Sequence, residues 1–203
     1  MVDDTTTSPK PTPSSSTLRE PTPLSNLPLP TRHITTHSPS GLATIHTSAP
    51  FTFTTHDASN LLFSVPYTTS QFPPNLNANN DIAAHDALLA SGTLGLVNPR
   101  GTVLRYVDFA PGYACAMHRT QSLDFGIVLE GEVEMVLDGG DRVVMKRGDV
   151  AVQRATQHQW VNCSKEVWAR MVFVLQDCEK LVVGGKEMGE DLGEESGLPP
   201  SGK

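Results

Sequence analysis

Short apolar runs separated by turn residues dominate the middle of the chain. The runs are rich in Val, Phe, Leu or Thr and are bounded by Gly, Pro, Asn or Asp, which is typical of β-strands. Closely spaced strands without alternating helices predict an all-β sandwich or barrel. The predicted strands are Leu42–His46, Phe51–Thr55, Leu61–Tyr67, Thr102–Phe109, Phe125–Leu129, Glu132–Leu137, Arg142–Lys146, Asp149–Gln153 and Glu166–Gln176.

Two glycine-containing turns indicate that neighbouring strands pair antiparallel. Gly139-Gly140-Asp141 separates two predicted strands and is typical of a hairpin turn, and Glu130-Gly131 has the same character. One helix-like stretch, residues 81–90, contains Ile82, Leu88 and Leu89. We expect this stretch to be a short turn or loop.

Both ends of the chain differ in composition from its middle. Residues 1–30 contain seven prolines and eleven Ser or Thr residues, and residues 184–203 contain six glycines and five acidic residues. Such segments bury too little apolar surface to offset the entropy lost on ordering. We therefore expect a disordered tail over 1–30, a single domain over 31–183 and a flexible acidic tail over 184–203.

Charge and composition exclude several classes of function. The 203 residues carry a net charge of -7 and no Lys/Arg block, so binding to nucleic acid or to an anionic membrane is not expected. The chain contains no run of eighteen apolar residues, so no transmembrane helix is predicted. The first residues lack the basic and apolar regions of a secretory signal. The three cysteines have no CxxC spacing, which favours reduced thiols and a cytoplasmic location.

Two histidines stand in the most specific pattern of the chain. Five residues separate Gly112 from His118, and Asp124 follows in the same stretch; a second stretch contains His158, with three residues between it and Asn162. This arrangement resembles the two-motif signature of the cupin superfamily over residues 102–176, and it is similar to small single-domain cupins of fungal polyketide tailoring pathways. The resemblance implies a cupin-type β-barrel, also described as a double-stranded β-helix or jelly roll.

The chain departs from the family pattern at its ligand positions. The second histidine of the first family motif falls on Thr120, and the family glutamate falls on Asp124. The resemblance then implies a metal site formed by His118, Asp124 and His158. Two imidazoles and one carboxylate suit Fe(II), and Zn(II) is a second candidate. The alternatives are structural histidines and an Asp124 that only accepts a hydrogen bond at the start of a strand. No organic cofactor is expected.

Side-chain alternation indicates which residues could share a pocket with these groups. Residues two apart on a strand share a face, so Ala116, His118 and Thr120 point the same way and Cys115 points the other way. A Cys–His nucleophilic pair is therefore not expected. The predicted substrate pocket consists of Thr120, Trp160, Arg170, Ala116 and Val128.

Arg170 has two interpretations, because it lies on an otherwise apolar strand face and requires an anionic partner if it is buried. It is either a clamp for a substrate carboxylate or half of a structural ion pair. The remaining histidines have no motif around them and are expected at the surface or in packing: His33, His37, His46, His56 and His85.

The resemblance also implies a function in secondary metabolism. The small cupins of fungal polyketide pathways are associated with dehydration, cyclisation, aromatisation or decarboxylation. The resemblance therefore implies a lyase that acts on a polyketide-like small molecule. Its catalytic residues would be His118, Asp124 and His158. An Fe(II)-dependent dioxygenase and a non-catalytic binding protein with a decayed metal site are the alternatives. A homodimer is expected, because the predicted strands Phe51–Thr55 and Leu61–Tyr67 could cover sheet edges across a two-fold axis.

Overall fold

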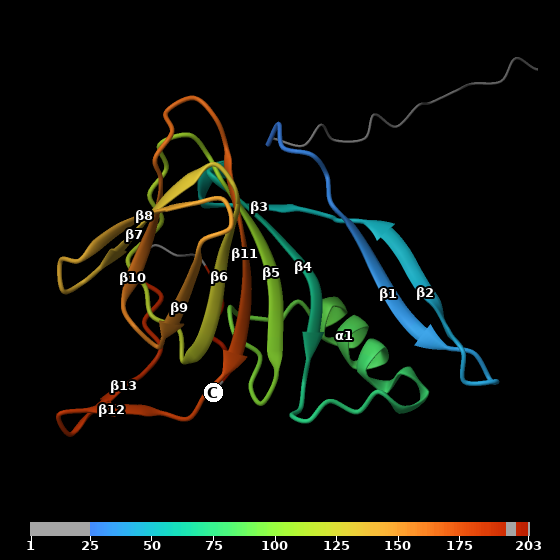
Figure 1. Ribbon diagram of the computed structural model, residues 1–203. Helices are drawn as coiled ribbons and strands as arrows, with labels where there is room; N and C mark the ends of the chain where they lie inside the picture. Colours follow the sequence, from blue (N-terminus) through green and yellow to red (C-terminus); the bar gives the residue numbers. More distant parts are fainter. Residues whose placement is uncertain (1–24, 194–197, 203) are drawn as a thin grey trace, which may run out of the picture.

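Two antiparallel sheets form a barrel in the computed structural model, which describes residues 25–193 and 198–202 (Figure 1). The larger sheet runs in the order β3 (Thr54–His56), β4 (Leu61–Thr69), β5 (Thr102–Phe109), β11 (Ala169–Asp177), β6 (Ser122–Glu130) and β9 (Val150–Arg154). The smaller sheet runs in the order β10 (His158–Asn162), β7 (Glu132–Leu137) and β8 (Arg142–Lys146). The predicted all-β barrel is confirmed.

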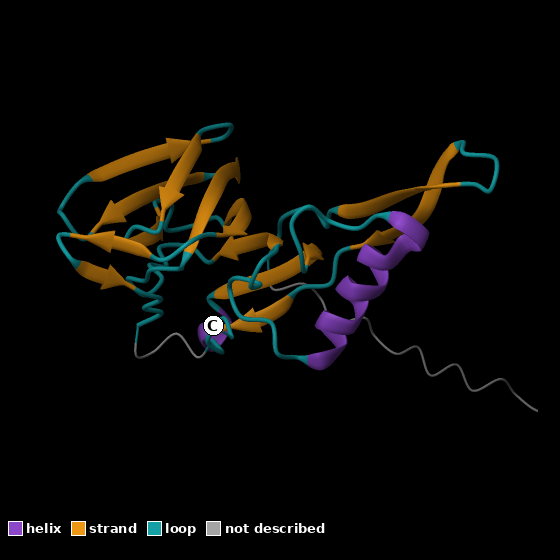
Figure 2. Cartoon of the chain, turned by 90° about the horizontal axis from the view of Figure 1, so that it is seen from below, coloured by secondary structure: helices purple, strands orange, loops and turns teal. Residues whose placement is uncertain are grey.

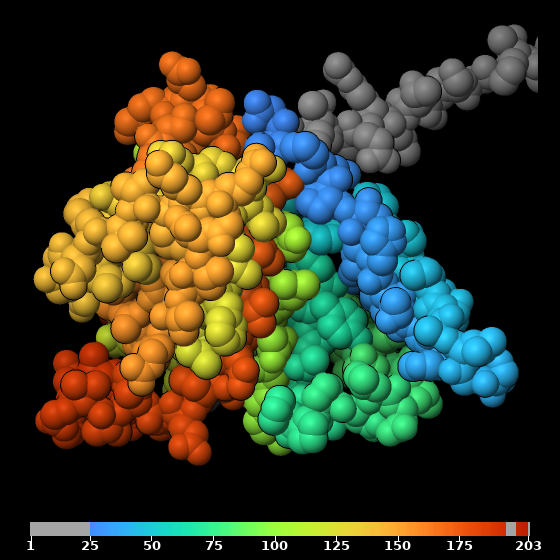
Figure 3. All heavy atoms as spheres, viewed as in Figure 1, coloured from blue at the N-terminus to red at the C-terminus, as the bar shows by residue number. Residues whose placement is uncertain are grey.

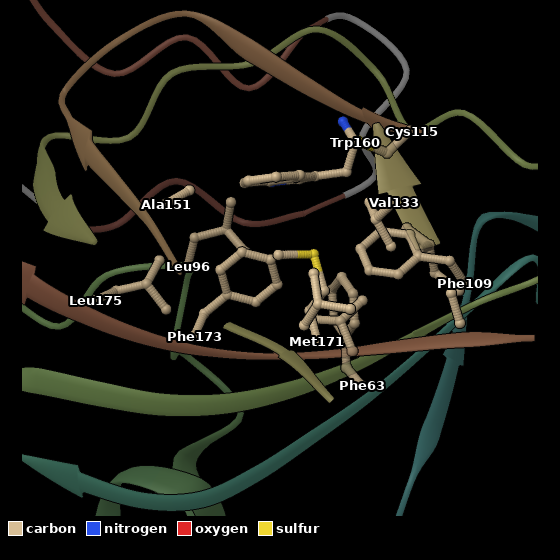
Figure 4. Close-up of a cluster of buried hydrophobic side chains, with 14 of the residues drawn as sticks. Phe63, Leu96, Phe109, Cys115, Val133, Ala151, Trp160, Met171, Phe173 and Leu175 are labelled. Carbon is tan, nitrogen blue, oxygen red and sulfur yellow. The ribbon is translucent and has the colours of Figure 1, made fainter. Parts of the chain in front are cut away.

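The inner faces of the two sheets supply the core. Alternate residues of β5 point inward, and Val103, Val107 and Phe109 are all buried. Figure 4 shows the Trp160 ring from the smaller sheet lying over Phe173 of the larger one, and the centroids of the two rings are 5.5 Å apart. Apolar contact between the sheets therefore fixes their separation on the side where the histidines lie.

Residues 80–91 form a twelve-residue helix, α1 (Asn80–Ser91), so the prediction of a short turn or loop over 81–90 was wrong. The helix ends at Gly92, which adopts φ 66° and donates its N–H to the Leu89 carbonyl. Its buried face consists of Ile82 and His85, and a buried histidine weakens the apolar pattern that a helix normally shows. Within the described ranges, no helix combines the length and apolar character that a membrane span requires.

A hairpin of β1 (Thr31–His37) and β2 (Ala43–Pro50) projects beside the barrel (Figure 1, Figure 3). Figure 2 shows α1 on this same side of the molecule. The His85 ring stacks on Tyr67 and lies within hydrogen-bond distance of Thr68 and Arg32, which joins the helix, β4 and the hairpin. His85 is thus a packing residue. The strand β1 has no counterpart among the predicted strands.

The strand expected over Leu61–Tyr67 is not available to cover a second molecule. As β4 it pairs with β3 on one side and β5 on the other, within its own sheet. Phe51 lies outside the regular strands, where its N–H donates to the Pro30 carbonyl and its ring packs edge-on against Tyr106. The structural basis proposed for a dimer is therefore contradicted for Leu61–Tyr67, whereas Thr54 and Thr55 lie in β3 at the edge of the larger sheet.

The segment expected as a flexible C-terminal tail has defined contacts where the structure describes it. A hairpin of β12 (Leu181–Val183) and β13 (Lys186–Met188) is followed by Asp191, which exchanges backbone hydrogen bonds with Arg119. Leu192 and Leu198 then pack against the core. The sequence did not predict these contacts, because apolar residues spaced widely among glycines give little local signal.

The N-terminal prediction falls partly outside the described residues. Residues 1–24 are not described, whereas residues 25–30 lie against the barrel. The Pro28 carbonyl accepts a hydrogen bond from Arg170, and Ser25 is buried. Among the described residues, contacts with the barrel therefore begin before the predicted boundary at residue 31.

Candidate functional site

A cavity of about 360 Å³ lies inside the barrel. Most of its wall is apolar and includes the aromatic rings of Phe63, Phe109, Trp160 and Phe173. A small set of polar groups interrupts this wall, as in sites for small molecules. These polar groups are His56, Asp57, Arg105, Tyr113, His118, Thr120, Asp124, His158 and Gln159.

His118 and His158 are held together by the backbone. Each donates its N–H to the carbonyl of the other over 2.9 Å, which joins the loop before β6 to the first residue of β10. Their ring centroids lie 4.4 Å apart with the planes tilted by 52°. The two imidazoles, predicted from their spacing in the sequence, therefore form a pair in the cavity wall.

Main-chain carbonyls fix the orientation of both rings. Nδ1 of His118 lies 2.8 Å from the Ala116 carbonyl, and Nδ1 of His158 lies 2.9 Å from the Thr156 carbonyl. Because a carbonyl only accepts, each Nδ1 carries the proton, and the lone pair of a neutral ring is on Nε2. Nε2 has no hydrogen-bond partner among the described residues in either ring. Each histidine thus offers one basic nitrogen to the cavity.

Burial keeps the pair uncharged. It lowers the pKa of His118, and burial together with the adjacent His118 lowers the pKa of His158 to about 3. Desolvation penalises the charged imidazolium, and a second positive charge beside it would add repulsion. At neutral pH both rings are therefore neutral bases.

Asp124 supplies a carboxyl group whose pKa is raised above its ordinary value. Burial raises its pKa to about 6, against the opposing effect of hydrogen bonds from Ser122 and Thr120. The Thr120 hydroxyl donates to Oδ2 over 3.1 Å, whereas the buried Oδ1 has no partner. Asp124 is thus close to half protonated slightly below neutral pH and has one oxygen free to engage another group.

The predicted three-ligand metal centre is not formed in this arrangement. Across residues 25–193 and 198–202, no three side chains of His, Cys, Asp or Glu are placed so that one ion could reach them all. Asp124 is directed instead toward the hydroxyls of Thr120 and Ser122, and an aspartate is one methylene shorter than the glutamate of the family pattern. Among the described residues, the donors therefore consist of a pair of imidazoles and a separate carboxyl group.

Three of the five residues predicted for the substrate pocket line this cavity. Ala116, Thr120 and Trp160 line the cavity. Val128 is fully buried in the apolar core behind the wall. Arg170 lies outside the wall and binds Asp108 through two hydrogen bonds, Nε to Oδ1 at 2.5 Å and Nη2 to Oδ2 at 2.7 Å. Its interpretation as a structural ion pair is thus correct.

Several groups of the wall escaped prediction. The His56 ring lies tilted against the Phe63 ring with centroids 4.4 Å apart, and the next residue, Asp57, accepts a hydrogen bond from the Tyr113 hydroxyl. Cys115 also lines the cavity, although alternation predicted the opposite face. The segment around it is not a regular strand and pairs with β10 through isolated bridges at Ala114 and His118, so strict alternation does not apply.

Arg105 is the wall residue that a sequence signal could have identified. It occupies an inward position of β5 between Val103 and Val107, where a cation is unusual.

Asn162 has a structural role. Its Nδ2 donates to the carbonyls of Phe109, Ala110 and Val167, and its Oδ1 accepts from the Ser164 N–H. The side chain thereby ties three loop segments at one end of the barrel. It contributes to the site by fixing the end of β10, the strand that begins at His158.

Comparison with known proteins identifies the family. The model of the cupin domain matches residues 105–175. The phomopsin biosynthesis cluster protein D of Diaporthe leptostromiformis is 42% identical over 161 residues, which cover 79% of this chain and 85% of the relative. The chain belongs to the cupin superfamily.

Other relatives of this cupin have similar descriptions. A cupin-domain-containing oxidoreductase of Aspergillus ruber is 38% identical over 174 residues, 84% of each chain. A cupin 2 conserved barrel domain protein from Salinispora arenicola, whose structure is solved, is 27% identical over 38% of this chain and 64% of that chain, with a TM-score of 0.35. The cupin thus resembles proteins of fungal biosynthesis clusters over most of its length.

Proposed function

We propose that this cupin is a lyase of secondary metabolism that acts on a small β-hydroxy or β-keto carbonyl compound. The pair of neutral imidazoles His118 and His158, each with Nε2 free beside an apolar cavity, carries the proposal. Similarity to the phomopsin and oryzines cluster proteins supports the metabolic setting.

The imidazole pair suits an elimination of water. Nε2 of one ring takes the proton from the carbon next to the carbonyl, and a carbon–carbon double bond forms as the bond to the β-oxygen breaks. The imidazolium returns the same proton to the leaving oxygen, which departs as water. Atoms and charge balance, and the ring is neutral again.

The rest of the wall would assist this chemistry. Asp124, whose burial raises its pKa to about 6, is a second carrier of protons near neutral pH. Trp160 and Phe173 present apolar surface that would hold a ring or an alkyl chain and exclude water. A water-poor site favours proton transfer between the substrate and a single nearby base.

Incubation with β-hydroxy thioesters and β-hydroxy ketones under argon tests the proposal. A product lighter by one water, formed equally with and without oxygen and after treatment with chelator, is the expected result. Absence of turnover across the panel, together with normal activity of His118→Ala in a reconstituted pathway, would instead indicate a non-catalytic binding protein.

An oxidoreductase is the second candidate, because that word stands in the names of relatives such as the Aspergillus ruber protein. It predicts that activity requires oxygen or a redox cofactor, with Fe(II) as the first metal to test. Comparison of aerobic and anaerobic reactions separates the two candidates. A product that contains oxygen from O₂ would contradict the lyase.

We also propose a homodimer in a reducing compartment such as the cytoplasm. The β1–β2 hairpin offers apolar surface for a second copy. Leu42, which precedes β2, is 70% exposed, and Ile45 within β2 is 56% exposed. The thiols of Cys115 and Cys163 are not part of a disulfide, which supports the compartment. Light scattering that gave the mass of one chain would contradict the dimer.

A further inference from the structure

A buried cation without a carboxylate partner lies in the wall of the barrel cavity. Arg105 is 6% exposed, and its Nε has no hydrogen-bond partner. One Nη2 hydrogen bond of 2.8 Å goes to the Gly95 carbonyl, and the guanidinium lies 5.1 Å from the centroid of the Phe63 ring. Among the described residues, no carboxylate lies within the 4.0 Å that defines an ion pair with Arg105.

The contrast with Arg170 shows how unusual this is. Arg170 is equally buried but donates hydrogen bonds to both carboxylate oxygens of Asp108. The carboxylates that share the cavity with Arg105 have other partners, since Asp57 accepts from Tyr113 and Asp124 accepts from Thr120. A buried guanidinium with an unused N–H is costly, and an anion supplied from outside the chain would remove that cost.

Arg105 is also accessible from a second direction. Together with His56, Phe63 and Leu198, it lines both the barrel cavity and a neighbouring hollow of about 490 Å³. Arg105 therefore stands where the two spaces meet. An anionic ligand that entered through the hollow would meet this cation before it reached the imidazoles.

We propose that Arg105 binds the carboxylate of the substrate, so that the cupin selects a carboxylic acid with an apolar or aromatic body. This inference deepens the proposed function and rests on it for the identity of the reaction. Arg105 comes from the larger sheet, whereas His158 comes from the smaller one and His118 is bonded to it. A substrate held by its carboxylate at Arg105 would extend across the cavity, with its body along the aromatic wall, toward the two bases.

The guanidinium of Arg105 and a carboxylate have matching geometries. A guanidinium binds a carboxylate through two parallel N–H···O bonds, which an amide or ester cannot reproduce with the same charge. Phe63 beneath the guanidinium leaves the edge of the cation available for such a pair. Selection of an acid over its amide is thus the signature of this site.

Binding of hydrocinnamate and hydrocinnamamide, measured by titration calorimetry and by quenching of Trp160 fluorescence in a Trp168→Phe background, tests the proposal. We expect the acid to bind at least about tenfold more tightly than the amide, which corresponds to about 1.4 kcal/mol. Arg105→Met should abolish this preference, and Arg105→Lys should retain part of it. Arg154→Met, which removes an exposed arginine of β9, is the matched control and should change nothing.

Thermal stability supplies an independent readout. If Arg105 binds ligand, Arg105→Met should keep or raise the thermal midpoint of the free protein, because it removes an unpaired buried charge. Equal binding of acid and amide by the unaltered protein would overturn the proposal, as would an unchanged acid preference in Arg105→Met. These measurements need no turnover, so a failed lyase assay leaves them intact, and loss of the acid preference leaves the lyase chemistry untouched.

Discussion

His118 and His158 exchange backbone hydrogen bonds of 2.9 Å in both directions, and this reciprocal pair sets their rings 4.4 Å apart. The contact joins two segments that are distant in the sequence. Because these bonds lie in the backbone, the fold itself sets the separation of the two rings. The arrangement of the bases is therefore built by the fold before any ligand binds.

Replacement of either base should remove activity without unfolding the barrel. We expect His118→Ala and His158→Ala each to lower kcat by at least about a hundredfold, the usual contribution of a general base. Circular dichroism and hydrocinnamate binding should remain close to those of the unaltered protein. His33→Ala, on the exposed side of β1, is the control, and a comparable loss there would contradict the assignment.

The Asp124 carboxyl should make stability depend on pH. Its folded pKa of about 6 exceeds the ordinary aspartate pKa of 3.8, so its favourable contribution is complete below about pH 4 and is lost as the pH rises through 6. Asp124→Asn should therefore stabilise the protein by up to about 3 kcal/mol at pH 8 and by little at pH 4. Urea unfolding across this range measures the difference, and a gain that did not vary with pH would contradict the shift.

Gly126 should control the size of the cavity. A Cβ at this position would lie 2.9 Å from Cε1 of Phe173, a residue of the cavity wall. Gly126→Ala should push the ring inward, cost about 1–3 kcal/mol and weaken hydrocinnamate binding. Gly139→Ala, where a Cβ would meet nothing within 4 Å, serves as the control. Unchanged ligand affinity in Gly126→Ala would show that the ring relaxes elsewhere.

The Arg170–Asp108 pair should be structural only. Removal of one member leaves the other charge buried, so Arg170→Met and Asp108→Leu should each destabilise the fold by about 3–5 kcal/mol, and the double variant should recover most of the loss. Chemical denaturation measures all three. Hydrocinnamate should bind the double variant normally. Equal binding of hydrocinnamate and hydrocinnamamide by the double variant would instead indicate that Arg170 binds the carboxylate.

The last described segment should contribute to both stability and binding. A chain that ends at residue 189 lacks the backbone bonds of Asp191 and the packing of Leu192 and Leu198, two residues of the cavity wall. We expect a loss of about 2–4 kcal/mol and weaker ligand binding. A chain that ends at residue 202 is the control. An unchanged thermal midpoint in the shorter chain would restore the interpretation of this segment as a dispensable tail.

Much of the barrel was predictable because it depends on local patterns. Alternating apolar runs and the turns at Gly131 and Gly140, both with positive φ, indicate the strands directly. The helix α1 was missed because its buried face contains His85 in place of an apolar residue. Contacts of Leu192 and Leu198 with the core were missed because isolated leucines have no periodicity to detect.

The candidate site was predictable in its histidines but not in its complete wall. The spacing of the two motifs predicted that His118 and His158 lie together. His158 is the first residue of β10, and His118 forms an isolated bridge to it. Arg105, His56 and Tyr113 come from other parts of the chain, and only the closure of the barrel gathers them. Asp124 was placed on the right strand face, but the direction of its carboxyl depends on hydroxyls two and four residues away.

The carbonyls of Ala116 and Thr156, which hold Nδ1 of the two rings, leave each imidazole a single nitrogen for proton exchange. A proton taken up at Nε2 then has no exit through the back of the ring. It returns to the ligand from the same side on which it was removed. The elimination should accordingly be syn, and a substrate that carries deuterium on one face of the carbon next to the carbonyl would report this.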